Sequence, residues 1–102
     1  MLTLLLSLSA FASVCPEWSD PVKIGALETN LVNEASGLVV SRQYPDRLYH
    51  INDSGDGPFF YQSKMDGSST QKITVKGMPQ PYDVEDLAQG PCGSGTCLFM
   101  AD

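Results

Sequence analysis

Four short apolar runs, separated by turn-forming residues, constrain the fold of this chain more than any other feature. The runs are GLVVS (37–41), RLYHI (47–51), FFYQS (59–63) and QKITV (71–75). β-branched and aromatic residues are frequent in them, and Pro, Gly, Asp and Ser cluster between them, which is typical of strands joined by tight turns. The pattern predicts one antiparallel sheet of four consecutive strands. These strands are expected near residues 36–42, 47–52, 58–64 and 71–76.

The predicted fold class is all-β, because no helical pattern is sustained along the chain. The segment ALETNLVNEASG (26–37) contains residues that helices tolerate, but two asparagines and Gly37 interrupt it, and it lacks an apolar stripe. Several of the apolar runs are continuous rather than alternating, which indicates a sheet covered on both faces. Blades packed around the axis of a β-propeller have this property.

The features around Glu34 recur around Glu85, which suggests an internal repeat. Glu34 lies 51 residues before Glu85, and LYHIN (48–52) lies 50 residues before LFMAD (98–102). A period of about 50 residues is typical of one four-stranded propeller blade. Between the two units, KGMPQPYD (76–83) has two prolines too close together for a central strand, so it is predicted to cross from one unit to the next.

The repeat divides the chain into parts and predicts a β-propeller fragment. We expect an N-terminal strand or linker at 13–33, a first blade at 34–77 and the truncated start of a second blade at 78–102. The last run stops at Asp102 with no turn or polar tail behind it, so we expect an N-terminal fragment of a longer protein. The remaining blades of that full-length chain would then be its nearest partners.

Residues 1–12, MLTLLLSLSAFA, are predicted to form a secretory signal peptide. The segment is uncharged and apolar or small, is too short to span a bilayer, and ends in Ala10-Phe11-Ala12, the small-x-small pattern that signal peptidase cleaves. The alternatives are a lipoprotein signal at Cys15 and a buried N-terminal strand or helix. The predicted location is therefore secreted or periplasmic, with no membrane span.

The charge pattern argues against a nucleic-acid partner. The chain carries 6 basic and 12 acidic residues, a formal net charge of −6, and the basic residues are scattered. Neither a phosphate-tracking stripe nor a polybasic membrane patch can be drawn from them. The expected external partner is an unidentified small molecule or protein.

The three cysteines are candidates for disulfide bonds, because export places them in an oxidising compartment. Cys92 and Cys97 flank the turn-forming spacer GSG between two apolar segments, so they are predicted to bond across a hairpin. Cys15 is left over. A zinc site is not predicted, because His50 is the only histidine and lies far away in the sequence.

Carboxylates at equivalent places in the two units form the candidate site. In a propeller the first strand of each blade lines the central channel, so Glu34 and Glu85 are expected to converge on its axis. Asn52 and Asp53 in the first unit and Asp86 and Asp102 in the second are predicted to add ligands. Ca²⁺ is the expected cation, because it takes about six to eight oxygen ligands in irregular geometry. The alternative is that Glu34 and Glu85 cap strand starts or accept backbone hydrogen bonds between blades.

Three other patterns fail as functional motifs. NDSGDG (52–57) is similar to the start of an EF-hand loop, but Ser63 then stands at position 12, where a bidentate Glu is required. Ser36 lacks the Gly-x-Ser-x-Gly context of a nucleophile and has no base beside it. His50, between two apolar residues, is expected to be a strand residue with a hydrogen-bonded ring rather than a general base.

Several motifs occur along the chain in a fixed order. They are EASGLVVS (34–41), RLYHINDSGD (47–56), YDVEDLAQGP (82–91) and CLFMAD (97–102). In this order they resemble the N-terminal stretch of a group of secreted or periplasmic bacterial proteins. The pattern of that group is a Glu-Ala-Ser-Gly strand, an Asn-Asp-Ser-Gly-Asp turn, and a Glu-Asp-Leu-Ala strand leading to Gly-Asp-Ile-Gly-Asp-Asn.

The resemblance implies a β-propeller fold. Members of the group are predicted propellers, distantly similar to calcium-dependent lactonase and gluconolactonase propellers and to esterase-like phytases. In those lactonases a blade-one Glu binds Ca²⁺, which Glu34 would match. The resemblance covers roughly residues 21–102, with two departures: Ala101 stands where Gly is usual, and the chain ends at Asp102, before Ile-Gly-Asp-Asn.

Two functions are expected. The first is an exported propeller whose full-length form is a divalent-cation-dependent hydrolase of small esters, lactones or phosphates, in which the metal polarises the scissile oxygen and orients water. The alternative is a non-enzymatic propeller that serves as a binding or scaffold module at the cell surface. Fold alone does not decide between them, so no catalytic residue is assigned.

Overall fold

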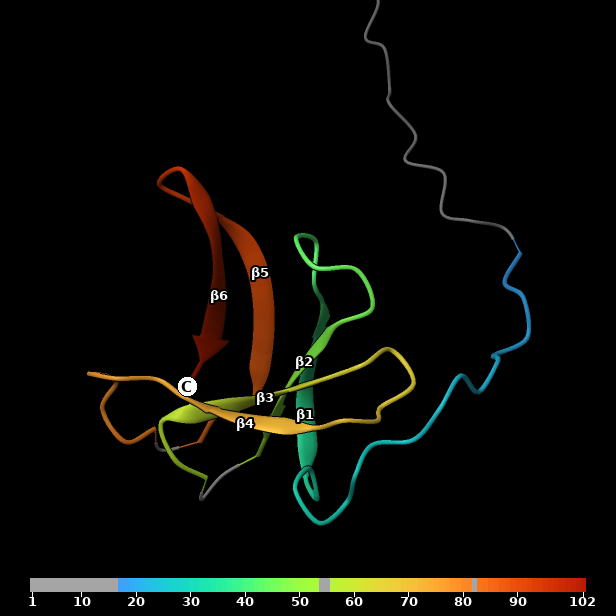
Figure 1. The fold of residues 1–102 in the computed structure, drawn as a ribbon, viewed down its shortest axis with the longest axis horizontal. Coiled ribbons are helices and arrows are strands. Elements are labelled where there is room, and N and C mark those ends of the chain that lie inside the picture. The colour runs from blue at the N-terminus through green and yellow to red at the C-terminus, as the bar shows by residue number, and fades with distance from the viewer. Residues whose placement is uncertain (1–16, 54–55, 82) are drawn as a thin grey trace, which may run out of the picture.

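Two antiparallel sheets make up the part of the protein that the computed structural model describes, residues 17–53, 56–81 and 83–102 (Figure 1). The first sheet has four strands in chain order, which are β1 Ala35–Val40, β2 Leu48–Asn52, β3 Phe59–Ser63 and β4 Gln71–Thr74. The second sheet is a hairpin of β5 Asp86–Cys92 and β6 Gly95–Ala101. No helix occurs within these described ranges.

The all-β prediction and the four-stranded meander are therefore confirmed. Each observed strand of the first sheet begins and ends within two residues of its predicted bounds. Agreement is this close because turn residues with local backbone preferences set the strand ends. The predicted signal peptide, residues 1–12, and Cys15 lie outside the described residues.

Residues 17–33, the described part of the predicted N-terminal strand or linker, contain no strand. Residues 24–27 lie along one face of the first sheet, and the Ala26 amide donates to the Asp66 carbonyl (3.0 Å). The Leu31 carbonyl accepts from the side-chain amide of Asn52 on β2 (3.0 Å). A search of the described residues for a helix long and apolar enough to cross a membrane finds none.

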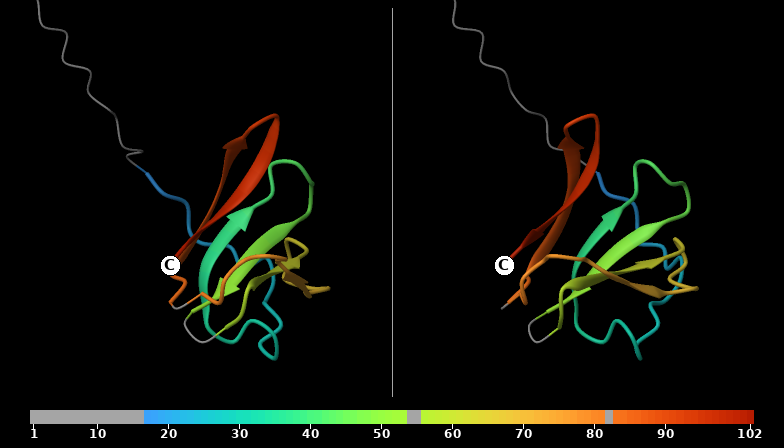
Figure 2. Two further views of the ribbon diagram at one scale, coloured as in Figure 1. Left: turned by 90° about the vertical axis from the view of Figure 1, so that its left-hand side faces the viewer. Right: turned by 60° about the vertical axis from the view of Figure 1, so that its left-hand side comes forward.

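The core lies between the two sheets, where the β5–β6 hairpin stands against β1 and β2 (Figure 2). Tyr49 and Ile51 on β2 pack with Val84 and Leu87. Because successive strand residues point to opposite faces, Leu48 faces the other way and lines a groove with the N-terminal segment. All five positions of β2 are thus buried, as the continuous apolar run predicted.

Gly37 allows the two sheets to approach closely. A Cβ atom at this position would lie 2.8 Å from the backbone nitrogen of Leu87 on β5 and 2.8 Å from the Ile51 side chain. The pairing of β1 with β2 is also irregular here, because Ala35 pairs with Asn52 and Gly37 with Ile51. This β-bulge bends the start of β1 at the point where β5 packs on it.

The predicted disulfide is present at the tip of the second sheet. Cys92 ends β5, Cys97 lies in β6, and their Cα atoms are 5.7 Å apart. Gly93, with a φ of 53°, adopts the left-handed conformation that the intervening tight turn requires. The disulfide therefore closes the hairpin at its turn, at the end opposite to Asp86, where β5 begins.

Candidate metal centre

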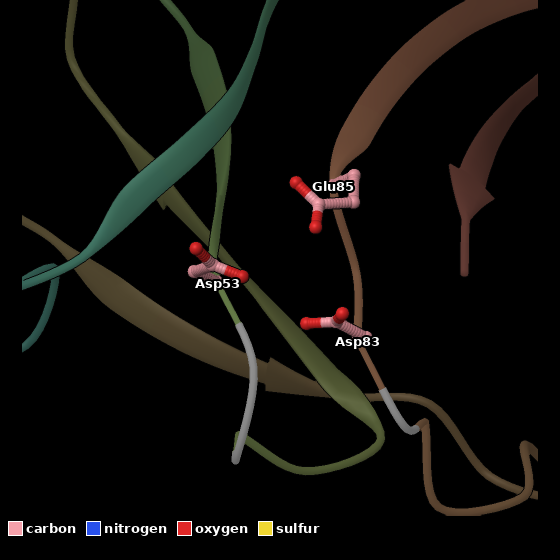
Figure 3. Close-up of side chains that lie close together, drawn as sticks. All are labelled: Asp53, Asp83 and Glu85. Carbon is pink, nitrogen blue, oxygen red and sulfur yellow. The ribbon is translucent and has the colours of Figure 1, made fainter.

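Three carboxylates converge where the ends of the two sheets meet (Figure 3). Asp53 directly follows β2, and Asp83 and Glu85 lie in the segment that leads into β5. One carboxylate oxygen from each residue lies within 4.8 Å of the others. Segments far apart in the sequence thus supply one compact group of oxygen ligands.

Backbone hydrogen bonds hold Asp53 in place. Its amide donates to the Glu34 carbonyl (2.8 Å), and the Glu34 amide donates to the side-chain oxygen of Asn52 (3.2 Å). The side-chain nitrogen of Asn52 also donates to Asp56 (3.2 Å). The segment before β1 and the end of β2 therefore hold one side of the centre in place.

A buried valine positions the other two carboxylates. Val84 is part of the core between the sheets, and its carbonyl accepts from the Ser36 hydroxyl (3.2 Å). Because residues two apart in an extended segment point the same way, Asp83 and Glu85 project together on the side opposite to Val84. The Glu85 amide donates to the Ala101 carbonyl (2.9 Å), which ties this segment to β6.

Of the predicted ligands, the structure brings the carboxylates of Asp53 and Glu85 together, and Asp86 lies outside the three-carboxylate group. Glu34 contributes its backbone to the neighbourhood, as described above, but its carboxylate is not part of the three-carboxylate group. Asp102 accepts a hydrogen bond from the Asp83 amide (2.9 Å) and is likewise outside that group. Ligand roles for Glu34, Asp53, Glu85 and Asp102 all remain predictions.

Asp83 is the member of the group that the sequence analysis missed. The signal was the order Asp83-Val84-Glu85, in which two carboxylates flank an apolar residue ahead of a strand. If the apolar residue is buried, strand alternation places both carboxylates on the opposite side. The repeat with Glu34 predicts Glu85 alone as a ligand, because Asp83 has no acidic counterpart in the first unit.

The chemistry of this group fits a hard divalent cation. Each carboxylate can offer one or two oxygens, so three supply a large share of the six to eight that Ca²⁺ takes. Glu85 is exposed and Asp53 is half-buried, so water and nearby carbonyl oxygens can complete the shell. Clustered like charges repel one another, and a bound cation would relieve that repulsion.

A second polar network supports the centre from the opposite face of β2. The Tyr61 hydroxyl donates to the Asp56 carboxylate (3.0 Å), which also accepts from Asn52. Burial of the phenol, with the adjacent Asp56 charge, raises the pKa of Tyr61 to about 12. Tyr61 therefore stays protonated and keeps Asp56 oriented at neutral pH.

His50 is a buried structural residue, as predicted. It is 0% exposed, and its Nε2 lies 2.7 Å from the Ser63 hydroxyl. Because Ser63 donates its own proton to the Lys64 carbonyl (2.9 Å), Nε2 is the donor to Ser63. Nδ1 has no hydrogen-bond partner among the described residues, and burial lowers the pKa of His50.

Comparison of the chain with models of protein families, with curated proteins and with solved structures gives no match.

Proposed function

We propose that this protein is an exported β-sheet protein that binds Ca²⁺ through Asp53, Asp83 and Glu85. One observation carries the proposal, namely that these three carboxylates, from two separate segments, lie within 4.8 Å of one another. Mg²⁺ fits less well, because it demands near-ideal octahedral geometry and usually keeps most of its waters, binding through one or two carboxylates. A bound Ca²⁺ would join the end of β2 to the start of β5.

The four-stranded sheet is assigned in this proposal to the first blade of a β-propeller, with β5 and β6 beginning the second. The meander in chain order, β1 to β4, and the packing of the next hairpin against its face support the assignment. The Cys92–Cys97 disulfide supports export, because disulfides persist mainly in oxidising compartments. The signal peptide at 1–12 belongs to the same proposal.

A hydrolytic role extends the proposal to the full-length chain. A cation held by Asp53, Asp83 and Glu85 with water in its remaining positions has the parts to polarise an ester, lactone or phosphate oxygen and to orient an attacking water. Glu85 is exposed, so a substrate can reach that side of the centre. No residue of the described chain is assigned as general base.

Calorimetric titration with Ca²⁺ tests the cation site. Asp83→Asn and Glu85→Gln keep side-chain size but remove one charge each, so each is expected to weaken binding by about tenfold or more. Asp86→Asn is the matched control, because Asp86 is an exposed neighbouring carboxylate outside the group. Equal affinity for Ca²⁺ in all three variants would show that Asp83 and Glu85 are ordinary surface charges and not ligands.

A non-enzymatic binding module is the second candidate function. The observation that favours it is an apolar groove beside β6, lined from both sheets and separate from the three carboxylates. Hydrolysis does not require such a groove, whereas protein recognition commonly uses one.

A further inference from the structure

A polar pocket of about 270 Å³ lies at the end of the first sheet opposite to the three carboxylates. Arg47 directly precedes β2, whereas Asp53 directly follows it, so the pocket and the candidate metal centre lie at opposite ends of this strand. The turn before β2, the end of β3 and the start of β4 form the pocket. Its polar lining includes Asp46, Arg47, Gln62, Lys64, Ser69 and Gln71.

Two cations face each other across the β2–β3 ladder at this end. Leu48 on β2 pairs with Ser63 on β3, and continuing that antiparallel register by one residue places Arg47 opposite Lys64. Like charges directly opposite each other on paired strands repel and destabilise the sheet. The basic residues are scattered along the sequence, so the fold alone brings these two together. A bound anion would relieve their repulsion.

No neighbouring carboxylate neutralises this pair of cations. Asp46 accepts from a backbone amide beyond the end of β3 (3.1 Å), and Asp66 accepts from the amide and the hydroxyl of Ser68 (2.9 and 2.7 Å). The hydrogen bonds from Ser68, and to a smaller extent the Lys64 charge, lower the pKa of Asp66. Both carboxylates are thus committed to the turns, and within the described ranges neither forms an ion pair with Arg47 or Lys64.

Arg47 is held in position by its surroundings. Its guanidinium lies over the Tyr44 ring, 4.7 Å from the ring centroid, and its side chain is half-buried. Less rotamer freedom is therefore lost when a ligand binds. The planar guanidinium presents paired N–H donors that match two oxygens of an anion, whereas Lys64 acts as a point charge.

Neutral donors lie beside the two cations. The Gln62 side-chain nitrogen donates to the Gln71 side-chain oxygen (2.8 Å), which holds Gln71 and leaves its amide nitrogen as a donor at the pocket. The exposed Ser69 hydroxyl is a further donor. Asp46 and Ser69 have φ values of 58° and 56°, and within the described ranges they are the only residues other than glycine with positive φ. Such backbone outliers cluster at ligand sites.

The pocket does not depend on the chain beyond Asp102, because all of its lining residues lie between positions 45 and 71. Elsewhere on the sheet the lining becomes apolar, at Phe60 and Val75, where strands of a completed second blade would pack. Extending that interface over Arg47 and Lys64 would bury two unpaired charges at a large cost in free energy. This end of the sheet is therefore expected to stay open to solvent.

From these features we infer that the pocket at Arg47 and Lys64 binds a phosphate group, either as inorganic phosphate or as a small phosphate monoester. A phosphate dianion offsets both cations, and its oxygens can accept from guanidinium, ammonium, hydroxyl and amide donors together. A carboxylate has one charge and two oxygens, so it would leave part of this donor set unused. The inference goes beyond the proposed function, because the pocket shares no residue with the three carboxylates and needs no Ca²⁺.

Titration of the isotope-labelled 102-residue chain with inorganic phosphate, followed by its backbone amide resonances, tests the inference. Saturable shifts are expected at residues 45–47, 62–64 and 69–71, at constant ionic strength. Arg47→Gln and Lys64→Gln are each expected to weaken binding by about fivefold or more. Lys76→Gln is the matched control, because it removes the same charge from an exposed lysine outside the pocket, and it is expected to stay within about twofold. Equal weakening in all three variants, or no saturable shift, would overturn the inference.

The Arg47→Lys variant separates recognition of phosphate from attraction to charge. It keeps the positive charge but removes the paired donors, so it is expected to weaken binding by about threefold. The dispersion of the amide resonances shows whether each variant folds. Full affinity in Arg47→Lys, or acetate binding as tightly as phosphate, would reduce the site to non-specific charge and overturn the inference.

Glycerol phosphate in place of inorganic phosphate identifies the source of the phosphate group. Tighter binding of this monoester would assign the pocket to a phosphorylated small molecule, and tighter binding of inorganic phosphate would assign it to the free ion. These titrations are run in EDTA, whereas the Ca²⁺ titration contains no phosphate. Failure of the cation site and failure of the phosphate pocket are therefore distinguishable.

Discussion

The second strands of the two hairpins, β2 and β6, each combine aliphatic and aromatic residues but differ in burial. LYHIN on β2 and LFMA on β6 are both apolar and aromatic, yet β2 is buried at all five positions and β6 at none. β2 has a strand on each edge, the second hairpin on one face and the N-terminal segment on the other. Neighbouring elements, more than composition, therefore decide how much of a strand is buried.

The largest expected effect comes from truncating the buried strand. Ile51 is 2% exposed, so Ile51→Ala is expected to lower the free energy of unfolding by about 2–5 kcal/mol, including the cost of the cavity. Phe99 on β6 is 52% exposed. Phe99→Ala removes a larger side chain than Ile51→Ala, but it is expected to lower the free energy of unfolding by only about 1 kcal/mol. Urea denaturation measures both values. If Phe99→Ala proved the costlier change, burial would not be what decides how much each side chain contributes to stability.

The disulfide is expected to have a smaller effect, confined to the second hairpin. For the short loop between Cys92 and Cys97, the loss of unfolded-chain entropy accounts for about 2 kcal/mol. The double variant Cys92→Ser/Cys97→Ser removes this contribution without altering the first sheet. Hydrogen exchange should then speed up in β5 and β6, while β2 and β3 keep their protection. Equal loss of protection in both sheets would show that they unfold as one unit.

The pH dependence of stability tests the first hairpin and is the smallest of the three effects. Burial lowers the pKa of His50 below its ordinary value of 6.5, so the unfolded chain binds a proton more readily than the folded protein does. The His50 contribution is therefore complete above pH 6.5 and declines as the pH falls from 6.5 toward the lowered folded-state pKa.

The His50→Gln variant is the control for this pH effect. Glutamine keeps a donor for Ser63 but does not titrate, so the decline of stability as the pH falls below 6.5 should flatten. Thermal denaturation at several pH values measures the slope. An unchanged slope in the variant would assign the pH dependence to the carboxylates.

The all-β class, the four-stranded sheet and the hairpin were predictable because their determinants are local. Turn residues at 44–46 and 66–69 separate runs of strand-forming residues, and the short spacer between Cys92 and Cys97 predicts a hairpin that the disulfide can close. Each of these features acts within a few residues, so a single sequence contains the whole signal.

The candidate site was predictable only in part, because it depends on register. Ala35 pairs with Asn52, whereas its counterpart Asp86 pairs with Ala101 rather than with Asp102, the residue that the repeat aligns with Asn52. The bulge in β1 has no equivalent in β5. A repeat counted along the sequence does not report such shifts, and a one-residue shift turns a side chain to the other face. Asp53 and Glu85 were found from the repeat, but the position of Asp83 became evident only from the buried Val84.

The hydrogen bond from Ser36 to Val84 has a consequence for the order of folding. It spans 48 residues of sequence, whereas the ladders within each sheet join neighbouring segments of the chain. Contacts between distant residues require long loops to close and generally form late, so each hairpin can zip up before the two sheets dock. Asp53, Asp83 and Glu85 would come together only in that last step, so cation binding at the proposed site would report completed folding.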